Sequence, residues 1–249
     1  MSPTPASSAA PSALTRKLAV FTTLTRAEEA RLERLQAQRR RHPARTELLH
    51  EAQGDHAAFV LQDGWAMSYK LLADGGRQVV DFQLPGDFLG LRSLLLRTSD
   101  HNVAAVTDIV VAEVPPRELG ELVETQPRLA MALLWAASRD EAMVVEHLVG
   151  IGRRSPIVRT AHQFLELHQR LRLVGLAEDG SFACPLNQYV LADALGLTAI
   201  HLNRTLRQLR ERGLMTFRKG RVVIQDAPAL MALAGFEDAY LDQHSPGRR

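Results

Sequence analysis

The sequence predicts an α+β fold in which a small antiparallel β-roll, one long helix and a C-terminal unit of short helices with a β-hairpin follow one another. Residues 46–115 hold short apolar runs between turn signals, and residues 126–153 hold a long apolar stripe at helical spacing. Residues 188–225 combine two short amphipathic segments with a basic hairpin. We therefore expect segments at residues 1–13, 14–125, 126–153, 154–228 and 229–249.

The composition is that of a soluble globular protein, with 46% hydrophobic and 23% charged residues among 249. No apolar run approaches the roughly 20 residues that a membrane-spanning helix needs. Residues 1–13 are rich in Ser, Pro and Ala, lack the features of a signal peptide, and are expected to form a disordered tail. We therefore expect a cytoplasmic protein with no membrane partner.

Helices and short strands are expected in the first half of the chain. Residues 14–21 lead into a helix from about Thr25 to Arg39, with Thr25 as its N-cap and a solvated basic run at residues 39–41 as its end. Beyond it, evenly spaced strands separated by Gly- and Pro-containing turns favour a small barrel or roll. The expected strands cover residues 57–61, 66–72, 79–83 and 109–114.

The long helix is expected to pair with a second copy of the chain. Its near-heptad apolar stripe lies between two predicted domains, which favours a dimer helix over a helix packed only within its own domain. Gly150 and Gly152 are expected to break the helix and form a hinge. The stripe comprises Leu129, Leu133, Ala136, Ala137, Asp140, Val144, Leu148 and Ile151.

Residues 188–209 predict two helices joined by a sharp turn. Gly196 stands where the first helix must stop, and Thr198 can cap the second by accepting a hydrogen bond from a free amide. Leu202 and Leu209 mark the buried face of that second helix. This arrangement is a helix-turn-helix, whose second helix enters the major groove of DNA. Residues 213–225 then read as a β-hairpin behind it, which is the wing of a winged helix.

Charge favours double-stranded DNA as the partner over an ordinary pair of packed helices. Between residues 198 and 221 there are seven Arg or Lys residues against Glu211 alone, although the whole chain carries only +2. A helix-turn-helix that serves protein contacts in a small-molecule signalling module is the alternative, and it has little need of a basic wing. The candidate DNA-binding residues are Thr198, Ile200, His201, Asn203, Arg204, Arg207, Arg218 and Lys219.

The order of these segments resembles the cAMP receptor protein/FNR (Crp/Fnr) family of bacterial transcription regulators. The most specific stretches are residues 82–90, Phe-Gln-Leu-Pro-Gly-Asp-Phe-Leu-Gly, and residues 191–209. The resemblance implies a cyclic-nucleotide-binding-like β-roll as sensor and a homodimer joined by the long helix. It also implies a winged helix on a palindromic operator, and RNA polymerase as a partner.

The sensor departs from the pattern of the members that bind cyclic nucleotides. They carry a Gly-Glu pair and a later Arg, but here Leu91 and Arg92 follow Gly90, and His101 and Asn102 stand where the Arg should be. We therefore expect no response to cAMP, because the acceptor for the ribose and the cation for the phosphate are both missing. The residues assigned to the sensor pocket are Gly86, Gly90, Leu91, Arg92, His101 and Asn102.

Cofactor and catalytic signals are weak. The single cysteine, Cys184, excludes the family's cysteine-ligated iron–sulfur cluster and is interpreted as a buried structural thiol, with a redox-active thiol as the alternative. No pair of the nine histidines has metal-ligand spacing with a carboxylate, and one axial histidine for haem would leave no signature. No catalytic motif is present, so we expect no enzyme and no cofactor, and the effector stays open.

Overall fold

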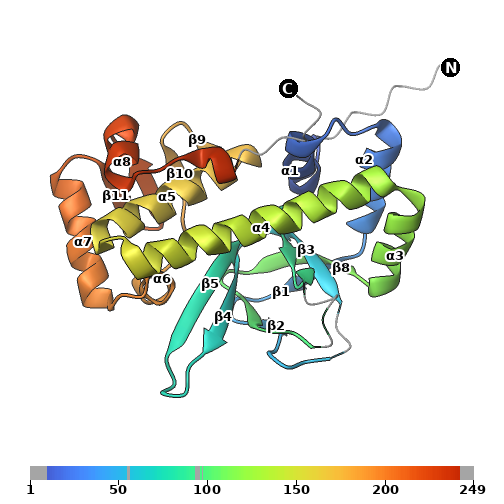
Figure 1. Cartoon of the computed structure of the whole chain (residues 1–249), viewed down its shortest axis with the longest axis horizontal. Helices are drawn as coiled ribbons and strands as arrows, with labels where there is room; N and C mark the ends of the chain where they lie inside the picture. The colour runs from blue at the N-terminus through green and yellow to red at the C-terminus, as the bar shows by residue number, and fades with distance from the viewer. Residues whose placement is uncertain (1–9, 55–56, 93–95, 97, 242–249) are drawn as a thin grey trace.

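The computed structural model describes residues 10–54, 57–92, 96 and 98–241, and it confirms the predicted order of β-roll, long helix and C-terminal reader (Figure 1). We call the C-terminal unit from α5 to β12 the reader. Of the tail predicted for residues 1–13, residues 1–9 lie outside the described residues, and Ser12 and Ala13 begin α1 as its N-cap and first residue. The elements are α1 (Ala13–Phe21), α2 (Arg26–Leu35), β1 (Arg39–His42), β2 (Glu47–Leu49), β3 (Ala58–Asp63), β4 (Ala66–Leu71), β5 (Arg77–Gln83), β6 (Phe88–Leu89), β7 (Asn102–Ala105), β8 (Ile109–Val114), α3 (Pro116–Thr125), α4 (Pro127–Arg153), α5 (Pro156–Leu173), β9 (Ala177–Glu178), β10 (Ser181–Ala183), α6 (Gln188–Leu195), α7 (Ala199–Glu211), β11 (Met215–Arg218), β12 (Arg221–Ile224), α8 (Ala227–Ala234) and the 3₁₀ turn η2 (Asp238–Tyr240).

The N-terminal helices are fixed by their caps. The Thr25 hydroxyl accepts from the Glu28 amide at 3.3 Å while the Glu28 carboxylate accepts from the Thr25 amide at 2.7 Å, which is a capping box. The helix ends at Leu35 and not at Arg39 as expected. The basic run that was expected to end it forms β1 instead, because Arg39 to His42 pair with β8 at the edge of a sheet. The side chains of Arg39, Arg40 and Arg41 remain exposed.

The roll consists of two four-stranded sheets among the described residues, with strand orders β1-β8-β3-β6 and β2-β7-β4-β5. The four predicted strands correspond to β3, β4, β5 and β8. The short strands β2, β6 and β7 were not expected. Strands β4 and β5 form a long antiparallel hairpin that projects from the roll beneath α4 (Figure 1).

Helix α4 crosses the whole molecule and covers the roll (Figure 1). The expected hinge at Gly150 and Gly152 is wrong, since both glycines lie inside α4, which ends only at Arg153. The apolar stripe is also divided. Leu129 and Leu133 are buried against α1, α2 and the roll, whereas Leu148 is 69% exposed.

The reader follows α4 after two residues, Arg154 and Ser155, and contains a four-stranded sheet of order β11-β12-β10-β9. One hydrophobic cluster joins it to the roll, because Val79 and Phe82 of β5 belong to the same cluster as Phe164 and Leu195 of the reader. No helix in the described part of the chain is long and apolar enough to cross a membrane.

Candidate nucleic-acid interface

Local hydrogen bonds fix the angle between α6 and α7. The Asn187 side chain caps α6 by accepting from the amides of Tyr189 and Val190, each at 3.0 Å. Gly196 then ends α6 with a φ of 58°, a left-handed conformation that favours glycine. The Thr198 hydroxyl caps α7 by accepting from the His201 amide at 3.2 Å. Gly196 and Thr198, which predicted this turn from the sequence, therefore make the expected backbone conformation and the expected cap in the structure.

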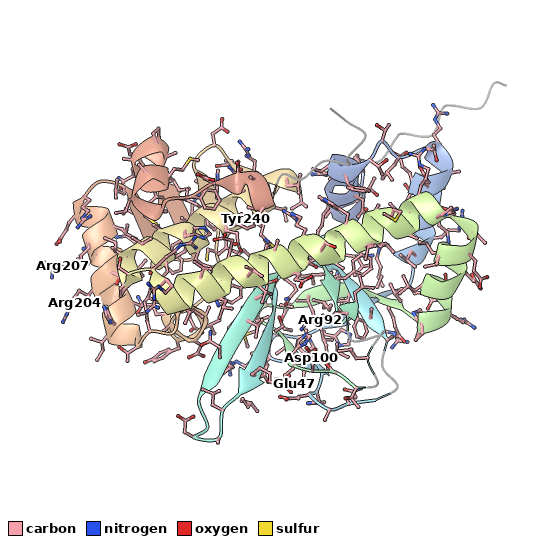
Figure 2. The ribbon with its side chains drawn as sticks, viewed as in Figure 1. Glu47, Arg92, Asp100, Arg204, Arg207 and Tyr240 are labelled. Carbon is pink, nitrogen blue, oxygen red and sulfur yellow. The ribbon has the colours of Figure 1, made fainter. Side chains whose placement is uncertain are left out.

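The outer face of α7 carries the predicted base-reading side chains. Ile200 is 78% exposed, and the side chains of His201, Asn203 and Arg204 are exposed beside it. Leu202 and Leu209, on the opposite face, are fully buried. Figure 2 shows Arg204 and Arg207 pointing outward from this helix, away from the body of the protein. One exposed face of α7 thus carries both the apolar side chain of Ile200 and the guanidinium of Arg204.

The two arginines of this face differ in their partners. Arg207 donates to the Glu211 carboxylate at 2.7 Å, one helical turn along α7. Arg204 has no ion-pair or hydrogen-bond partner among the residues that the structure describes. A free guanidinium can donate bidentately to the O6 and N7 atoms of guanine. Arg204 keeps this capacity, whereas the Arg207 guanidinium is engaged by Glu211.

Sequence reasoning missed two residues at the start of α6. The Asn203 amide donates to the Gln188 side-chain oxygen at 2.7 Å, so Gln188 holds one of the candidate readers in place. Its neighbour Tyr189 is 74% exposed beside the same surface. Periodicity could not reveal either residue, because both lie on the solvent side of a short helix.

The wing has its basic side chains at its tip. Lys219 and Gly220 form the turn between β11 and β12 with φ values of 49° and 71°. Arg218 and Lys219 are exposed and lack a charged partner within the described residues. Arg221 differs, because its guanidinium donates to the Glu178 carboxylate at 2.6 Å and to the Ser181 hydroxyl at 2.8 Å. Only the first two are therefore free to neutralise phosphate groups.

Two glycines assigned to the expected sensor pocket lie in close contact with other parts of the chain. A Cβ atom at Gly86 would meet the backbone of Ala13 at 2.8 Å, and one at Gly90 would clash with the Leu49 side chain. Both glycines have positive φ and serve close packing. Leu91 packs against the cluster formed by the N-terminal helices and α4.

Charged groups of the pocket neutralise one another. The Asp100 carboxylate accepts from Arg92 at 2.8 Å and lies 2.6 Å from the His101 ring nitrogen Nδ1. These charges hold the pKa of Asp100 below its ordinary value despite its partial burial. The Asn102 side chain is buried and accepts from the Glu51 amide at 3.0 Å. Figure 2 shows Arg92 and Asp100 close together in the roll. The Asp100 carboxylate of the protein itself therefore pairs with Arg92, at the place where an anionic ligand would otherwise bind.

Cys184 has the environment of a structural thiol. Its side chain is fully buried, and burial raises its pKa to about 12. The thiolate is the reactive form, so this geometry does not favour the redox-active alternative. Within the described residues, no three His, Cys, Asp or Glu side chains are grouped so as to hold a metal ion.

A buried ionic cluster that sequence reasoning also missed connects the roll, α1, α4 and the reader. The Asp87 carboxylate accepts from Lys17 of α1 at 2.8 Å and from Arg170 of α5 at 2.9 Å. Arg170 also donates to Asp81 at 3.0 Å. The adjacent cations hold the pKa of Asp87 below its ordinary value, against the effect of burial, whereas burial raises the pKa of Asp81 to about 6.

Comparisons with known proteins agree with this architecture. Residues 39–126 match the family described as "Cyclic nucleotide-binding domain", and residues 158–233 match that described as "Crp-like helix-turn-helix domain". The nitrogen fixation regulation protein FixK of Bradyrhizobium diazoefficiens is 32% identical over 172 residues, which cover 69% of this chain and 71% of that protein. The transcriptional activatory protein AadR of Rhodopseudomonas palustris is 29% identical over 220 residues, which cover 88% of this chain and 90% of that protein.

Solved structures show the same fold. The structure of FixK2 from Bradyrhizobium japonicum superimposes with a TM-score of 0.72 at 27% sequence identity, covering 80% of this chain and 98% of that chain. The described roll, long helix and winged reader thus have counterparts in sequence and in structure. The chain belongs to the Crp/Fnr family of bacterial transcription regulators, and its C-terminal domain is a helix-turn-helix DNA-binding domain of the Crp type.

Proposed function

We propose that the protein is a homodimeric, sequence-specific transcription regulator that reads a palindromic operator. The observation that carries this proposal is a solvent-exposed apolar stripe on α4. Met131, Leu134, Val145 and Leu148 are 54%, 59%, 53% and 69% exposed. Together with Ser138 and Glu141 they follow alternating steps of three and four residues, which is the heptad spacing of a coiled-coil seam.

A second copy of the same helix is the occupant that fits this stripe. A heptad seam packs against another helix of the same spacing, and such a pairing buries the same side chains of both copies. Two chains then present two recognition helices related by a two-fold axis. A dimer of this kind reads half-sites about one helical turn apart. The operator is therefore expected to be palindromic.

The reading of each half-site is divided between α7 and the wing. Arg204 is assigned to a guanine, Ile200 to an apolar contact such as a thymine methyl group, and Asn203 to an adenine edge. His201 is a further candidate reader. Arg218 and Lys219 are assigned to phosphates, which fix the protein's register on the duplex. Arg207 is assigned to a phosphate as well, for which it would exchange its exposed partner Glu211.

Sedimentation and DNA titration test the dimer together. We expect two chains per symmetric duplex, and an affinity that falls steeply with salt because arginine and lysine displace counterions from phosphates. A protein that sediments only as a monomer and binds DNA as one chain per site would contradict the proposal.

Selection from random duplexes should recover half-sites that keep the guanine read by Arg204. Half-sites without a preferred thymine would show that Ile200 does not make an apolar contact with a base.

The sensor is proposed not to respond to cAMP. Asp100 already pairs with Arg92 and His101, so a cyclic phosphate would have to displace a carboxylate from Arg92, the arginine assigned to the expected pocket. Calorimetry with cAMP and cGMP should show no binding in the micromolar range, which corresponds to about −8 kcal/mol. Saturable binding in that range would contradict this part of the proposal and assign Arg92 to the phosphate.

The partners and the cellular location of the protein are proposed on the same grounds as its regulatory function. RNA polymerase is proposed as a partner, the cytoplasm as the place where the regulator meets DNA, and catalysis is not part of its activity. The alternative is a signalling module whose helix-turn-helix contacts proteins. Arg204, Arg218 and Lys219 have no charged partner in the part of the chain that the structure describes, and this favours DNA. A guanine can accept from Arg204, and phosphates can neutralise Arg218 and Lys219.

A further inference from the structure

The reader is attached to the rest of the chain by a covalent linker at its N-terminal end and by several non-covalent contacts. The covalent attachment is short, because only Arg154 and Ser155 separate the end of α4 from the start of α5. A rigid body that is held at one such point can still rotate about it. The non-covalent contacts therefore decide the orientation of the recognition helix. Two of them hold α5 from outside strand β5: the Arg16 guanidinium of α1 donates to the Val174 backbone oxygen at 2.6 Å, and Asp87 pairs with Arg170 at 2.9 Å.

Strand β5 supplies the contacts to α6, at the N-terminal end of the strand. The Arg77 guanidinium donates from Nε at 3.0 Å and from Nη2 at 2.7 Å to the same carboxylate oxygen of Asp193. The adjacent Gln78 side chain donates to the backbone oxygen of Ala194 at 3.2 Å. The Arg77 and Asp193 side chains are 28% and 31% exposed. Both contacts lie on the helix that directly precedes the recognition helix.

The C-terminal end of β5 holds α5 in the same way. Arg170 of α5 donates to the backbone oxygen of Phe82 at 2.6 Å and to the Asp81 carboxylate at 3.0 Å. The apolar side chains of Val79 and Phe82 pack into the reader between these polar contacts. We call the contacts of residues 77, 78, 81 and 82 with α5 and α6 the β5 clamp. Figure 1 shows β5 beneath the C-terminal half of α4, on the side where α6 lies.

We propose that the β5 clamp sets the distance between half-sites that the dimer accepts, with Arg77 and Asp193 as positioning residues. The inference rests on the proposed function, because spacing has meaning only for a dimer on a symmetric operator. The separation of two half-sites is read by the distance and angle between the two recognition helices. The clamp fixes that angle relative to α4, which is the helix proposed to form the dimer.

Charge reversal at the exposed end of the clamp tests the proposal. Arg77→Asp and Asp193→Arg each place like charges together, and the double variant restores an opposite pair. Arg170 is unsuitable because it is buried, and its loss would unfold the protein. The matched control is Arg40→Asp. It reverses one charge of the ion pair that Arg40 forms with Glu113 at 2.9 Å on the surface of the roll, between β1 and β8. Affinity is measured for duplexes at the preferred spacing, for spacings changed by one and two base pairs, and for a single half-site.

The wild type and the Arg40→Asp control should prefer one spacing. In each single clamp variant the preference over shifted spacings should fall by about two- to five-fold, as expected for a partly exposed ion pair. The base preference on a single half-site should stay unchanged, and the double variant should recover the spacing preference. A merely structural pair would instead weaken all duplexes alike.

Two outcomes would overturn this inference but not the proposed function. In the first, the single variants keep the full spacing preference. In the second, the single variants lose it and the double variant does not recover it. A wild-type protein that binds every spacing equally would overturn the proposed palindromic operator and the inference with it. The two failures are therefore distinguishable in one set of titrations.

Discussion

Asp87, in the turn before β6, and Arg170, near the C-terminal end of α5, form a 2.9 Å ion pair in the interior of the protein. The Arg170 side chain is 3% exposed and that of Asp87 is 8% exposed. The second oxygen of Asp87 accepts from Lys17 of α1 at 2.8 Å. One carboxylate thus connects the N-terminal helix, the roll and the reader.

Replacing Asp87 should cost far more stability than replacing an exposed carboxylate. Asp87→Ala leaves two buried cations without this partner, so we expect a loss of about 3–5 kcal/mol in the free energy of unfolding. Asp100→Ala, which removes the exposed partner of Arg92, should cost about 1 kcal/mol or less. Urea denaturation measures both. Equal losses would show that the Asp87 cluster contributes no more than a surface pair.

The pH dependence of stability should contain a contribution from His162. Burial, together with the nearby Arg154 charge, lowers the pKa of His162 to about 4 from its ordinary value of 6.5, although Glu146 acts in the opposite direction. The unfolded chain therefore binds this proton more tightly than the folded one. The contribution of the neutral His162 ring to the free energy of unfolding is fully present above pH 6.5, and it is lost as the pH falls towards 4.

His162→Gln removes this contribution. Between pH 7 and pH 5, the wild type should lose about 1–2 kcal/mol more unfolding free energy than the variant. The raised pKa of Asp81 acts in the opposite direction, but it is present in both proteins and cancels in the difference. Urea denaturation at both pH values gives the comparison. Parallel losses in the two proteins would place the His162 ring in a more solvated site.

Arg204 and Arg218 should differ in what they contribute to DNA binding. Arg204→Ala removes a proposed guanine contact, so it should cost about 1–3 kcal/mol and relax the preference at one base pair. Arg218→Ala removes a phosphate contact and should weaken all sequences alike while reducing the salt dependence. Arg117→Ala, an exposed arginine on α3, is the control. Loss of base preference in Arg218→Ala would reverse the two assignments.

Glu141 should limit the strength of the dimer. It occupies a seam position of the α4 stripe between Leu134 and Leu148, where a paired helix would bring two carboxylates together. Glu141→Leu should lower the dimer Kd by about ten-fold, or about 1.4 kcal/mol, in sedimentation equilibrium. Glu124→Leu, an exposed substitution on α3 outside the stripe, should leave it unchanged. A weaker dimer in Glu141→Leu would place the seam on another face of α4.

The features decided by neighbouring residues were predictable from the sequence. Gly196 and Thr198 determine the turn of the reader through a left-handed backbone and a side-chain cap, both of which act within four residues. The strands β3, β4, β5 and β8 and the wing were likewise apparent from apolar runs between turn residues. The family resemblance rested on these local patterns, and the comparisons confirmed it.

Tertiary structure decided the features that depend on distant segments. Arg39 to His42 form a strand only because β8, about 70 residues later, offers them an edge to pair with. Leu129 and Leu133 face inward because α1 and the roll cover them, and a periodic pattern with two apolar faces cannot say which one is covered. The Asp87–Arg170 pair joins residues 83 positions apart. Helical and strand periods are set by the local backbone, whereas burial and ion pairing are set by the surfaces that folding brings together.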